Sequence, residues 1–291
     1  MPISVVILTF NSEASIGKTL ASVAGLSDDI HVVDSYSKDR TLDISREFGA
    51  NVTEHSFENY GAQRNWAIEN LPLKHDWQLH LDADERLSDA LLAEIKALNV
   101  GEGGVVGYHV PRLMHFMDKP IRHGAMFPTW HMRLFKTGMG HCEARLYDQH
   151  FYADGPTQQL KNHMVDDIQM SLSEWTARHN RWADAEVQEI LAKQTDRRVQ
   201  ASFWGNPVER KRYLRGLYDR TPLFVRPFAL FFYRYFLRFG FLDGSEGFIF
   251  YVLQTFWFRF IVDAKLYEAR RAARRKAIPT QVEPEPVASR G

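Results

Sequence analysis

Short apolar runs alternate with amphipathic stretches along the first hundred residues of the chain. The apolar runs are rich in β-branched residues, as strands buried on both faces are; they are residues 3–9, 30–33, 51–54 and 77–81. The stretches between them place apolar residues at helical spacing, which predicts helices from about residue 16 and over residues 41–48, 60–71 and 87–98. Strands that alternate with helices predict an α/β fold with a mostly parallel, right-handed sheet that is covered on both faces.

The pattern becomes less regular after residue 100. Residues 105–110 and 132–136 are predicted strands, and the segment 115–130 between them is rich in histidine, proline and aromatic residues. Residues 171–194 return to helical spacing and predict one long helix. We therefore expect an α/β domain over residues 1–200.

Aromatic residues and arginines interleave from about residue 203 to residue 265. On a helix, Arg226, Arg234 and Arg238 fall within an arc of roughly 120°, and a basic stripe opposite an aromatic face is typical of helices in a membrane interface. Residues 247–262 are apolar, but they are fewer than the about 20 that a spanning helix needs. We predict a membrane-associating helical region over residues 201–277, whose helices lie on the membrane or re-enter it.

Two alternatives for this region stay open: an all-α subdomain, and an interface of a homo-oligomer that buries the aromatic side chains in protein. Burial of so many arginines in a dry core would be costly, which favours the membrane. The basic run at residues 270–276 then lies near anionic headgroups. Residues 278–291 are rich in proline and glutamate and are predicted to be disordered.

Composition narrows the class of protein. A chain of 291 residues has room for one large domain or for one domain with an appendage. The 36 basic and 36 acidic residues balance, so charge gives no case for a nucleic-acid partner. The single cysteine, Cys142, excludes an intramolecular disulfide framework and fits a reducing compartment. With no signal-like leader, these features predict a cytoplasmic location.

Two carboxylates, Asp82 and Asp84, follow the strand at residues 77–81. In an open α/β sheet, ligands bind outside the carboxyl ends of the strands. Adjacent acids repel each other unless a cation lies between them, and Mg²⁺ or Mn²⁺ suits carboxylate oxygens and substrate phosphates. The alternative is that Asp84 only caps the helix at residues 87–98.

The other strand ends are polar as well. They supply Thr9 and Asn11, then Asp34, Ser35 and Asp39. Polar side chains that converge on one sheet edge are typical of a nucleotide site. A turn followed by a helix cap is the alternative explanation for residues 34–39.

Four motifs in order carry a resemblance to a known family. They are Val5-Val-Ile-Leu-Thr-Phe-Asn-Ser-Glu, Asp34-Ser-Tyr-Ser-Lys-Asp-Arg-Thr, Gly61-Ala-Gln-Arg-Asn-Trp-Ala and Leu81-Asp-Ala-Asp-Glu. The chain resembles family 2 glycosyltransferases, which have the GT-A fold. The second and third motifs resemble the branch of lipopolysaccharide core β-glucosyltransferases and exopolysaccharide glycosyltransferases. The resemblance is strong over residues 3–100, fair to about residue 180 and weak beyond.

The resemblance implies roles for these residues. The nucleoside of a UDP-sugar would lie among Thr9, Asn11, Asp34, Ser35 and Asp39. Arg64 and Asn65 would face the same pocket, although Arg64 has the alternative of a solvated helix charge. Asp84 would bind the metal, and Asp82 would contact the ribose or the metal. His163 would be a further metal ligand or a diphosphate contact, although a single histidine is more often structural.

The catalytic base is predicted at Glu143. Related sequences carry a His-Glu pair after an Arg-Leu-Phe strand, whereas this chain has Cys142 between His141 and Glu143. Asp154 and Asp118 are alternatives, and an exposed loop carboxylate is the plain structural explanation. The base would take a proton from the acceptor hydroxyl in a single, inverting displacement. His123, Trp130 and Arg133, with His115 and Arg122, are predicted on the acceptor side, where a packed surface loop is the alternative.

These inferences give one leading hypothesis. It is a metal-assisted, inverting glycosyltransferase that uses a UDP-sugar and a lipid-linked glycan, lipopolysaccharide or exopolysaccharide acceptor, peripheral to the inner face of the cell membrane. Transfer to a polyprenyl phosphate is one alternative, and a catalytically idle scaffold of a polysaccharide assembly complex is another. A nucleotidyltransferase would also use paired acids, but residues 10–13 do not form the expected glycine-rich phosphate loop.

Overall fold

A computed structural model describes residues 2–145, 148–192, 202–205 and 207–277 of the chain. One mixed sheet runs through the molecule in the order β3-β2-β1-β4-β8-β6-β12-β5, and β7 and β11 pair with β6 at its margin. β9 and β10 form a separate hairpin. The strands are β1 (Ser4–Thr9), β2 (Ile30–Asp34), β3 (Asn51–Glu54), β4 (Trp77–Asp82), β5 (Glu85–Leu87), β6 (Gly107–Phe116), β7 (Lys119–Pro120), β8 (Thr129–Lys136), β9 (Gly140–Cys142), β10 (Phe151–Ala153), β11 (Thr157–Gln159) and β12 (Met164–Ile168).

The first four strands of this order are parallel, as predicted, and their register aligns their carboxyl ends. Thr9 lies opposite Asp34, and Leu8 lies opposite Asp82. β8 then joins β4 in the antiparallel sense, and β12 runs parallel to β6. The α/β fold is therefore confirmed, with the polar strand ends gathered at one edge of the sheet.

Helices cover both faces of the parallel half, and the strand residues alternate between two cores. Val5 and Ile7 pack with α1 (Ile16–Val23) and α4 (Asp89–Ala97), whereas Val6 and Leu8 pack with α3 (Tyr60–Asn70). This period of two is what a strand buried on both faces requires. α2 (Thr41–Glu47) completes this part of the fold.

The predicted and observed elements differ most around residues 85–130. The residues after Asp84 form the short strand β5, and the helix begins only at Asp89 with Ser88 as its cap. The Ser88 side chain accepts from the Leu91 amide, so Asp84 is not the helix cap. β6 continues through Phe116, and β7 follows it, which orders part of the segment that we expected to be irregular.

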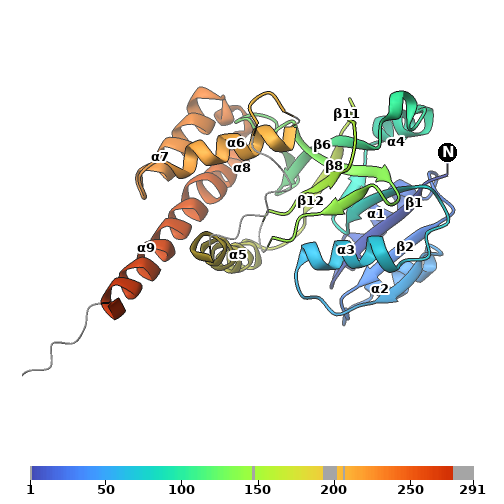
Figure 1. Ribbon diagram of the computed structural model, residues 1–291, viewed down its shortest axis with the longest axis horizontal. Helices are drawn as coiled ribbons and strands as arrows, with labels where there is room; N and C mark the ends of the chain where they lie inside the picture. Colours follow the sequence, from blue (N-terminus) through green and yellow to red (C-terminus); the bar gives the residue numbers. More distant parts are fainter. Residues whose placement is uncertain (1, 146–147, 193–201, 206, 278–291) are drawn as a thin grey trace, which may run out of the picture.

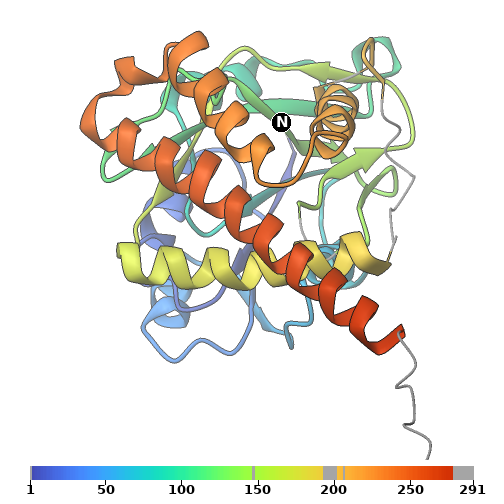
Figure 2. The same ribbon diagram turned by 90° about the vertical axis from the view of Figure 1, so that its left-hand side faces the viewer.

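A second group of helices lies beyond β6, β8 and β12, at the end of the molecule away from β1–β3 (Figure 1). The long helix α5 (Leu172–Ala192) is crossed by α9 (Phe258–Ala277) (Figure 2), and Ala183 and Val187 of α5 share a core with α9. A further core joins this group to β6. The remaining elements are η1 (Glu102–Gly104), α6 (Pro207–Asp219), α7 (Val225–Phe232), the π-helical turn η2 (Tyr233–Leu237), η3 (Gly240–Asp243), α8 (Gly244–Tyr251) and the π-helical turn η4 (Val252–Trp257).

The predicted arginine stripe is wrong. Arg226 is buried and paired with Asp263 through both Nε and Nη2. Arg234 points into the cleft described below, and Arg238 is exposed. Turns and π-helical geometry rotate the three side chains away from the common face that a regular helix would give them.

An aromatic patch remains on the outside of these helices. It is contiguous through the ring of Tyr235, which contacts Phe236, Phe241 and Phe248. Its exposed members are Phe228, Phe232, Tyr233, Phe236, Leu237, Phe239, Phe241, Leu242 and Phe248. Among the described residues, one helical stretch, Gly240–Arg275, is long and apolar enough to cross a membrane by length and composition, and 39% of its most apolar window is buried in protein. The division at residue 200 and the disordered tail stay predictions, and residues 278–291 lie outside the described residues.

Candidate functional site

A large cleft opens between the carboxyl edge of the sheet and the second group of helices. Its volume is about 1450 Å³. One end is lined by the loops after β1, β2 and β4, and the other by α5, α6 and the π-helical turns η2 and η4. Among the predicted site residues, the cleft wall includes Thr9, Asn11, Ser35, Arg64, Asp82, Asp84, Trp130 and Arg133.

The loops after β1 and β2 are held together by hydrogen bonds at the end of the cleft where a nucleoside was predicted. The Asn11 amide donates to Ser37 Oγ at 2.8 Å, and the Lys38 amide donates to Asn11 Oδ1 at 2.8 Å. Behind them, the buried Asp34 carboxylate accepts from the Ser37 amide at 2.7 Å. Asp39 accepts from the amides of Glu13 and Thr41, both at 3.0 Å.

Thr9 is the clearest sign that this end receives a ligand. Its hydroxyl is buried, and it has no hydrogen-bond partner among the described residues. Buried polar groups are normally paired, so Thr9 Oγ1 is available to a polar group in the cleft. Asp34 and Asp39 are not on the cleft wall, and their direct contact with a nucleoside stays a prediction.

Asp82 is held between two arginines. Arg64 Nη2 lies 2.9 and 3.0 Å from the two carboxylate oxygens, and Arg133 Nη2 lies 3.1 Å from one of them. Burial disfavours the charged carboxylate, but Arg64 and Arg133 outweigh it and hold the pKa of Asp82 well below its usual range. Arg133 also bonds Glu85 Oε1 at 2.5 Å. Arg133 therefore supports the acids, and its predicted place on the acceptor side is corrected.

Asp84 is the opposite case, because its carboxylate has no hydrogen-bond or ion-pair partner among the described residues. Burial raises the pKa of Asp84 well above its usual range, and the charges of Asp166, Asp82 and Glu85 raise it further. An unpaired acid with other acids around it favours a cation. Its donor set, carboxylate oxygen beside a second carboxylate, fits Mg²⁺ or Mn²⁺.

The candidate metal site at Asp84 is not a complete protein cage. No group of three acid, histidine or cysteine side chains that would hold a metal is present among the described residues. His163 is not on the cleft wall, and its ring packs edge-on against Phe127 with the ring centroids 5.7 Å apart. The structure therefore does not place His163 with Asp82 and Asp84. One or two carboxylates completed by substrate phosphates and water is a common arrangement for Mg²⁺.

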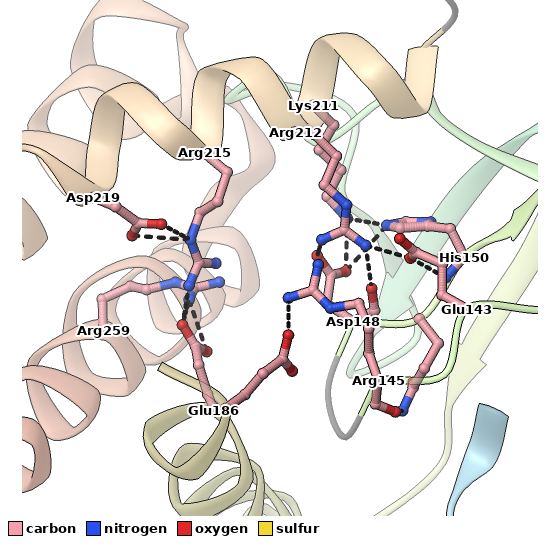
Figure 3. A network of polar contacts seen from close by, with 12 residues as sticks. Glu143, Arg145, Asp148, His150, Glu186, Lys211, Arg212, Arg215, Asp219 and Arg259 are labelled. Carbon is pink, nitrogen blue, oxygen red and sulfur yellow. Dashed lines mark hydrogen bonds and ion pairs between the residues drawn. The ribbon is translucent and has the colours of Figure 1, made fainter. Parts of the chain in front are cut away.

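The structure does not place Glu143, the predicted base, at the cleft. The side chain is fully buried and is not on the cleft wall. Its Oε2 accepts from the His150 amide at 2.9 Å and from Arg212 of α6 (Figure 3). Burial raises its pKa, with Arg212 opposing that shift. Glu143 therefore anchors α6 to the loop after β9 and does not reach an acceptor. Its two alternatives are also off the cleft wall: Asp118 is exposed, and Asp154 pairs with His141.

Two further predicted residues have structural partners instead. The Asn65 amide group donates to the Cys142 carbonyl at 3.0 Å and accepts from the Cys142 amide at 2.8 Å, which fixes β9 against α3. His123 Nδ1 lies 2.6 Å from Asp243 and docks η3. Neither side chain is on the cleft wall, whereas Trp130 is.

Several cleft residues escaped the sequence analysis. Arg112 pairs with Asp166 at 3.2 Å beside Asp84, and the strand β12 that carries Asp166 was not predicted. Arg178 of α5 lies over the Trp182 ring at 4.7 Å, and its buried Nε has no partner among the described residues. A usable signal was present, because Arg178 and Trp182 are four residues apart on the predicted helix.

Comparison with known proteins gives the family. The model described as glycosyl transferase family 2 matches residues 4–153, just over half of the chain. The first curated relatives, glycosyltransferases of Rickettsia species, are matched over only about a third of their own length. An uncharacterized glycosyltransferase of Rickettsia conorii is 27% identical over 279 residues, which cover 92% of this chain and 90% of that protein.

Two other likenesses are more distant. The lipopolysaccharide core biosynthesis glycosyltransferase LpsC of Rhizobium meliloti is 26% identical over 48% of this chain and 53% of its own. The crystal structure of glucosyl-3-phosphoglycerate synthase from Mycobacterium tuberculosis with Mn²⁺ and UDP is 21% identical over 39% of this chain and 44% of its own, with a TM-score of 0.32. No argument rests on so low a score. On the family match and the topology of its sheet, the chain belongs to glycosyltransferase family 2.

Proposed function

We propose that the protein is an inverting glycosyltransferase that moves a sugar from a UDP-sugar to a lipid-linked glycan, lipopolysaccharide or exopolysaccharide acceptor. The observation that carries this proposal is the unpaired Asp84 carboxylate beside Asp82 on the wall of the cleft, next to the unpaired Thr9 hydroxyl. A site of this kind suits a diphosphate with its cation at Asp84 and a nucleoside at Thr9, Asn11 and Ser35.

The residues divide the work between binding and charge. Asp84 would hold Mg²⁺ or Mn²⁺, with Asp82 beside it. When bound, a divalent cation supplies Lewis acidity to the leaving diphosphate. Arg64 and Arg133 keep Asp82 ionised and fixed in place. Because these side chains are already bonded to each other, the site needs little reorganisation when charge develops on the leaving group.

Asp166 is our replacement for Glu143 as the proton acceptor. It lies on the cleft wall near Asp84, and Arg112 holds one of its oxygens at 3.2 Å. A base must come within hydrogen-bond reach of the acceptor hydroxyl, and Asp166 meets the condition of exposure to the cleft that Glu143 does not. Transfer of the hydroxyl proton to the free carboxylate oxygen accompanies attack on the anomeric carbon.

The acceptor is proposed to arrive from the membrane. The aromatic patch, with Arg238 beside it and the exposed arginines 270–275 on α9, has the apolar and basic surface of a protein that lies on anionic lipid. We therefore propose a location at the inner face of the cell membrane, which this surface supports. The similarity to LpsC supports an acceptor of the lipopolysaccharide type.

Calorimetry with UDP tests the core of the proposal. Wild-type protein should bind UDP with a Kd that tightens at least tenfold when Mn²⁺ is added. Asp84→Asn should lose this response to Mn²⁺. Its matched control is Asp89→Asn, which changes an exposed acid in the first turn of α4 and should keep the response. UDP binding that ignores Mn²⁺, or no UDP binding at all, would reject the proposal.

Transfer to a polyprenyl phosphate stays the second candidate, because the aromatic patch suits an isoprenoid chain as well as a bilayer. The idle-scaffold alternative predicts a degraded acid pair, whereas Asp82 and Asp84 are both present and Asp82 is held by Arg64. A screen of nucleotide sugars with membrane lipid extract separates these readings by the product that forms.

A further inference from the structure

The two ends of the cleft carry opposite charges. The acids of the wall come mainly from β4, β5 and β12 and the turn between β4 and β5: Asp82, Asp84, Glu85, Asp166 and Asp167. The cations of the far wall come from α5, α6, η2 and α9: Arg178, Arg181, Arg210, Lys211, Arg212, Arg215, Arg234 and Arg259. Arg64, Arg112 and Arg133 pair with some of these acids. A ligand that spans the cleft therefore meets a net acidic end, which is proposed for the donor and is called the donor end, and a basic end opposite it.

Many of these cations already have carboxylate partners (Figure 3). Lys211 Nζ lies 2.8 Å from Asp148, and Arg259 Nη1 lies 3.0 Å from Glu186, which also pairs with Arg215. These pairs hold α6 and α9 against α5 and the loop after β9. These paired cations build the wall, whereas Arg181 and Arg210 are exposed to solvent.

Two partly buried cations of this wall lack a carboxylate partner among the described residues: Arg178, whose charge acts on Asp84, and Arg234. Arg234 lies away from the acids. It has no carboxylate partner among the described residues, and its one polar contact is with the sulfur of Met126, a weak acceptor. Burial lowers the pKa of Arg234 to about 10, and the nearby charge of Arg259 adds to this. A partly buried cation without a counter-charge is costly, so its retention at the cleft wall points to an anion that arrives from outside.

The local backbone supports a binding role. Arg234 lies in the π-helical turn η2, and Gln254 and Thr255 of the second π-helical turn, η4, are on the same cleft wall. π-Helical turns are rare and occur frequently at functional sites. Here they give the helices the extra residue that brings polar side chains to the cleft.

The outer face of the same turn belongs to the aromatic patch. Phe232 and Phe236 flank Arg234 in sequence and are 54% and 47% exposed. Arg234 thus lies at the boundary between the polar cleft and an apolar surface. An amphipathic ligand would place an anionic group at Arg234 and its hydrocarbon over Phe232 and Phe236.

We propose that Arg234 binds a phosphate carried by the acceptor, so that the acceptor substrate is a phosphorylated, amphipathic molecule. This inference rests on the proposed function, which it sharpens by giving the acceptor an anionic group. The phosphate has two sources with one chemistry: the phosphate that links lipid to glycan, or a phosphate on the glycan itself. Guanidinium binds either one through paired N–H donors.

The test measures anion binding to the full chain with the donor site saturated by UDP and Mg²⁺. Calorimetry uses farnesyl phosphate below its critical micelle concentration, sn-glycerol 3-phosphate, and farnesol as the tail without phosphate. Arg234→Gln should weaken farnesyl phosphate at least tenfold and leave UDP binding unchanged. Arg220→Gln removes an exposed arginine at the end of α6 that is not on the cleft wall, and it should bind like wild type.

The outcomes separate the sources and the hypotheses. Farnesyl phosphate that binds much more tightly than glycerol 3-phosphate, with both sensitive to Arg234→Gln, supports the lipid-linking phosphate; equal affinities support a phosphate on the glycan. Equal binding to wild type and Arg234→Gln overturns the proposal, and so does a parallel loss of UDP binding. If Arg234→Gln does not fold, Arg234→Lys should retain binding that is weaker than wild type. If UDP does not bind to the wild-type protein, the proposed function is rejected instead. The binding of farnesyl phosphate and glycerol 3-phosphate can then still be measured without UDP.

Discussion

The two ends of the cleft are built in different ways. At the donor end, Thr9, Asp34 and Asp82 lie side by side because β1 pairs with β2 and β4 in a parallel register. At the other end, the wall consists of helices that are held by ion pairs between distant segments, such as Arg212 with Glu143, 69 residues away. Backbone pairing positions the proposed chemistry, whereas side-chain packing positions the proposed acceptor site.

The charge balance differs in the same way. The donor end contains Asp84, an acid that its neighbours destabilise, and the far end contains Arg234, a cation without a carboxylate. Each end therefore holds one ionisable group whose charged form a substrate or its cation would stabilise. Such groups reduce the stability of the fold and favour ligand binding. Substitutions at either end of the cleft test this difference between the two ends.

The largest effect is expected from Asp84→Asn. Loss of the cation ligand should lower turnover on the order of 10³-fold, the scale at which one electrostatic contact to a leaving group acts. The same substitution removes a carboxylate whose pKa is raised by burial and acidic neighbours, so the free energy of unfolding should increase by about 1 kcal/mol. Urea denaturation and initial rates measure the two changes.

Asp89→Asn is the control for both measurements, and it should change neither. A turnover near wild type in Asp84→Asn would remove the metal role. A fall in its stability would show that Asp84 is structural.

The second substitution pair compares the present and former candidates for the base. Asp166→Asn should lower kcat by about 10²-fold or more while the Kd for UDP is unchanged. Glu143→Gln breaks a buried ion pair with Arg212, and it should cost about 3 kcal/mol of stability but reduce kcat less than tenfold at a temperature where it is folded.

Asp154→Asn, an exposed acid on the loop after β10, controls for loss of charge. If Glu143→Gln abolishes turnover while its melting curve matches wild type, Glu143 is the base after all. The loop after β9 would then have to move its carboxylate into the cleft.

The sequence allowed prediction of the donor end because its signals are local. Alternating apolar residues define β1 and β4, and polar residues follow each strand directly, so topology alone places Thr9 near Asp82. The family motifs cover this part of the chain as well. The sequence did not identify the residue that caps α4. In the structure the cap is Ser88, which accepts from the Leu91 amide, and not Asp84.

The far end was not predictable by the same reasoning. Whether Glu143 is exposed depends on Arg212, and whether Arg226 is exposed depends on Asp263. Neither ion pair can be predicted from the spacing of apolar residues along the sequence. The arginine stripe was wrong for the same reason, because helical spacing predicts which residues share a face only while the helix is regular, and η2 is a π-helical turn.

The third prediction concerns pH and buried histidines. His80 lies beneath the acids, and burial followed by the charges of Arg64 and Arg133 lowers its pKa to about 3. His179 of α5 lies at the far end, where burial lowers its pKa to about 4. Below pH about 6.5, the ordinary pKa of histidine, these two residues bind protons in the unfolded chain but not in the folded protein. Stability is therefore lost as pH falls from about 6.5 towards about 4 and 3.

The size of the loss is about 1.4 kcal/mol per pH unit for each histidine, or about 2 kcal/mol each at pH 5. His80→Gln and His179→Gln should each reduce the difference in unfolding free energy between pH 7 and pH 5 by that amount. Asp84 acts in the opposite sense, because its raised pKa makes protonation favourable to the folded state. Asp84→Asn should therefore steepen the acid loss, and urea titrations at both pH values test all three variants.

The smallest effect is expected on the surface of the far end. Phe236 is 47% exposed in the aromatic patch, and insertion of half of a phenyl side chain into lipid contributes about 1 kcal/mol. Phe236→Ser should weaken binding to anionic vesicles about fivefold, a change that sedimentation of vesicles measures. Phe48→Ser, at a site 42% exposed beside α2, is the matched control and should bind like wild type. Equal losses for both variants would mean that the patch is not the membrane contact. Phe236 lies outside the cleft wall, so its substitution should also leave UDP binding and transfer to a water-soluble acceptor unchanged. A loss of transfer only with the membrane-borne acceptor would show that this acceptor contacts both the aromatic patch and the basic end of the cleft.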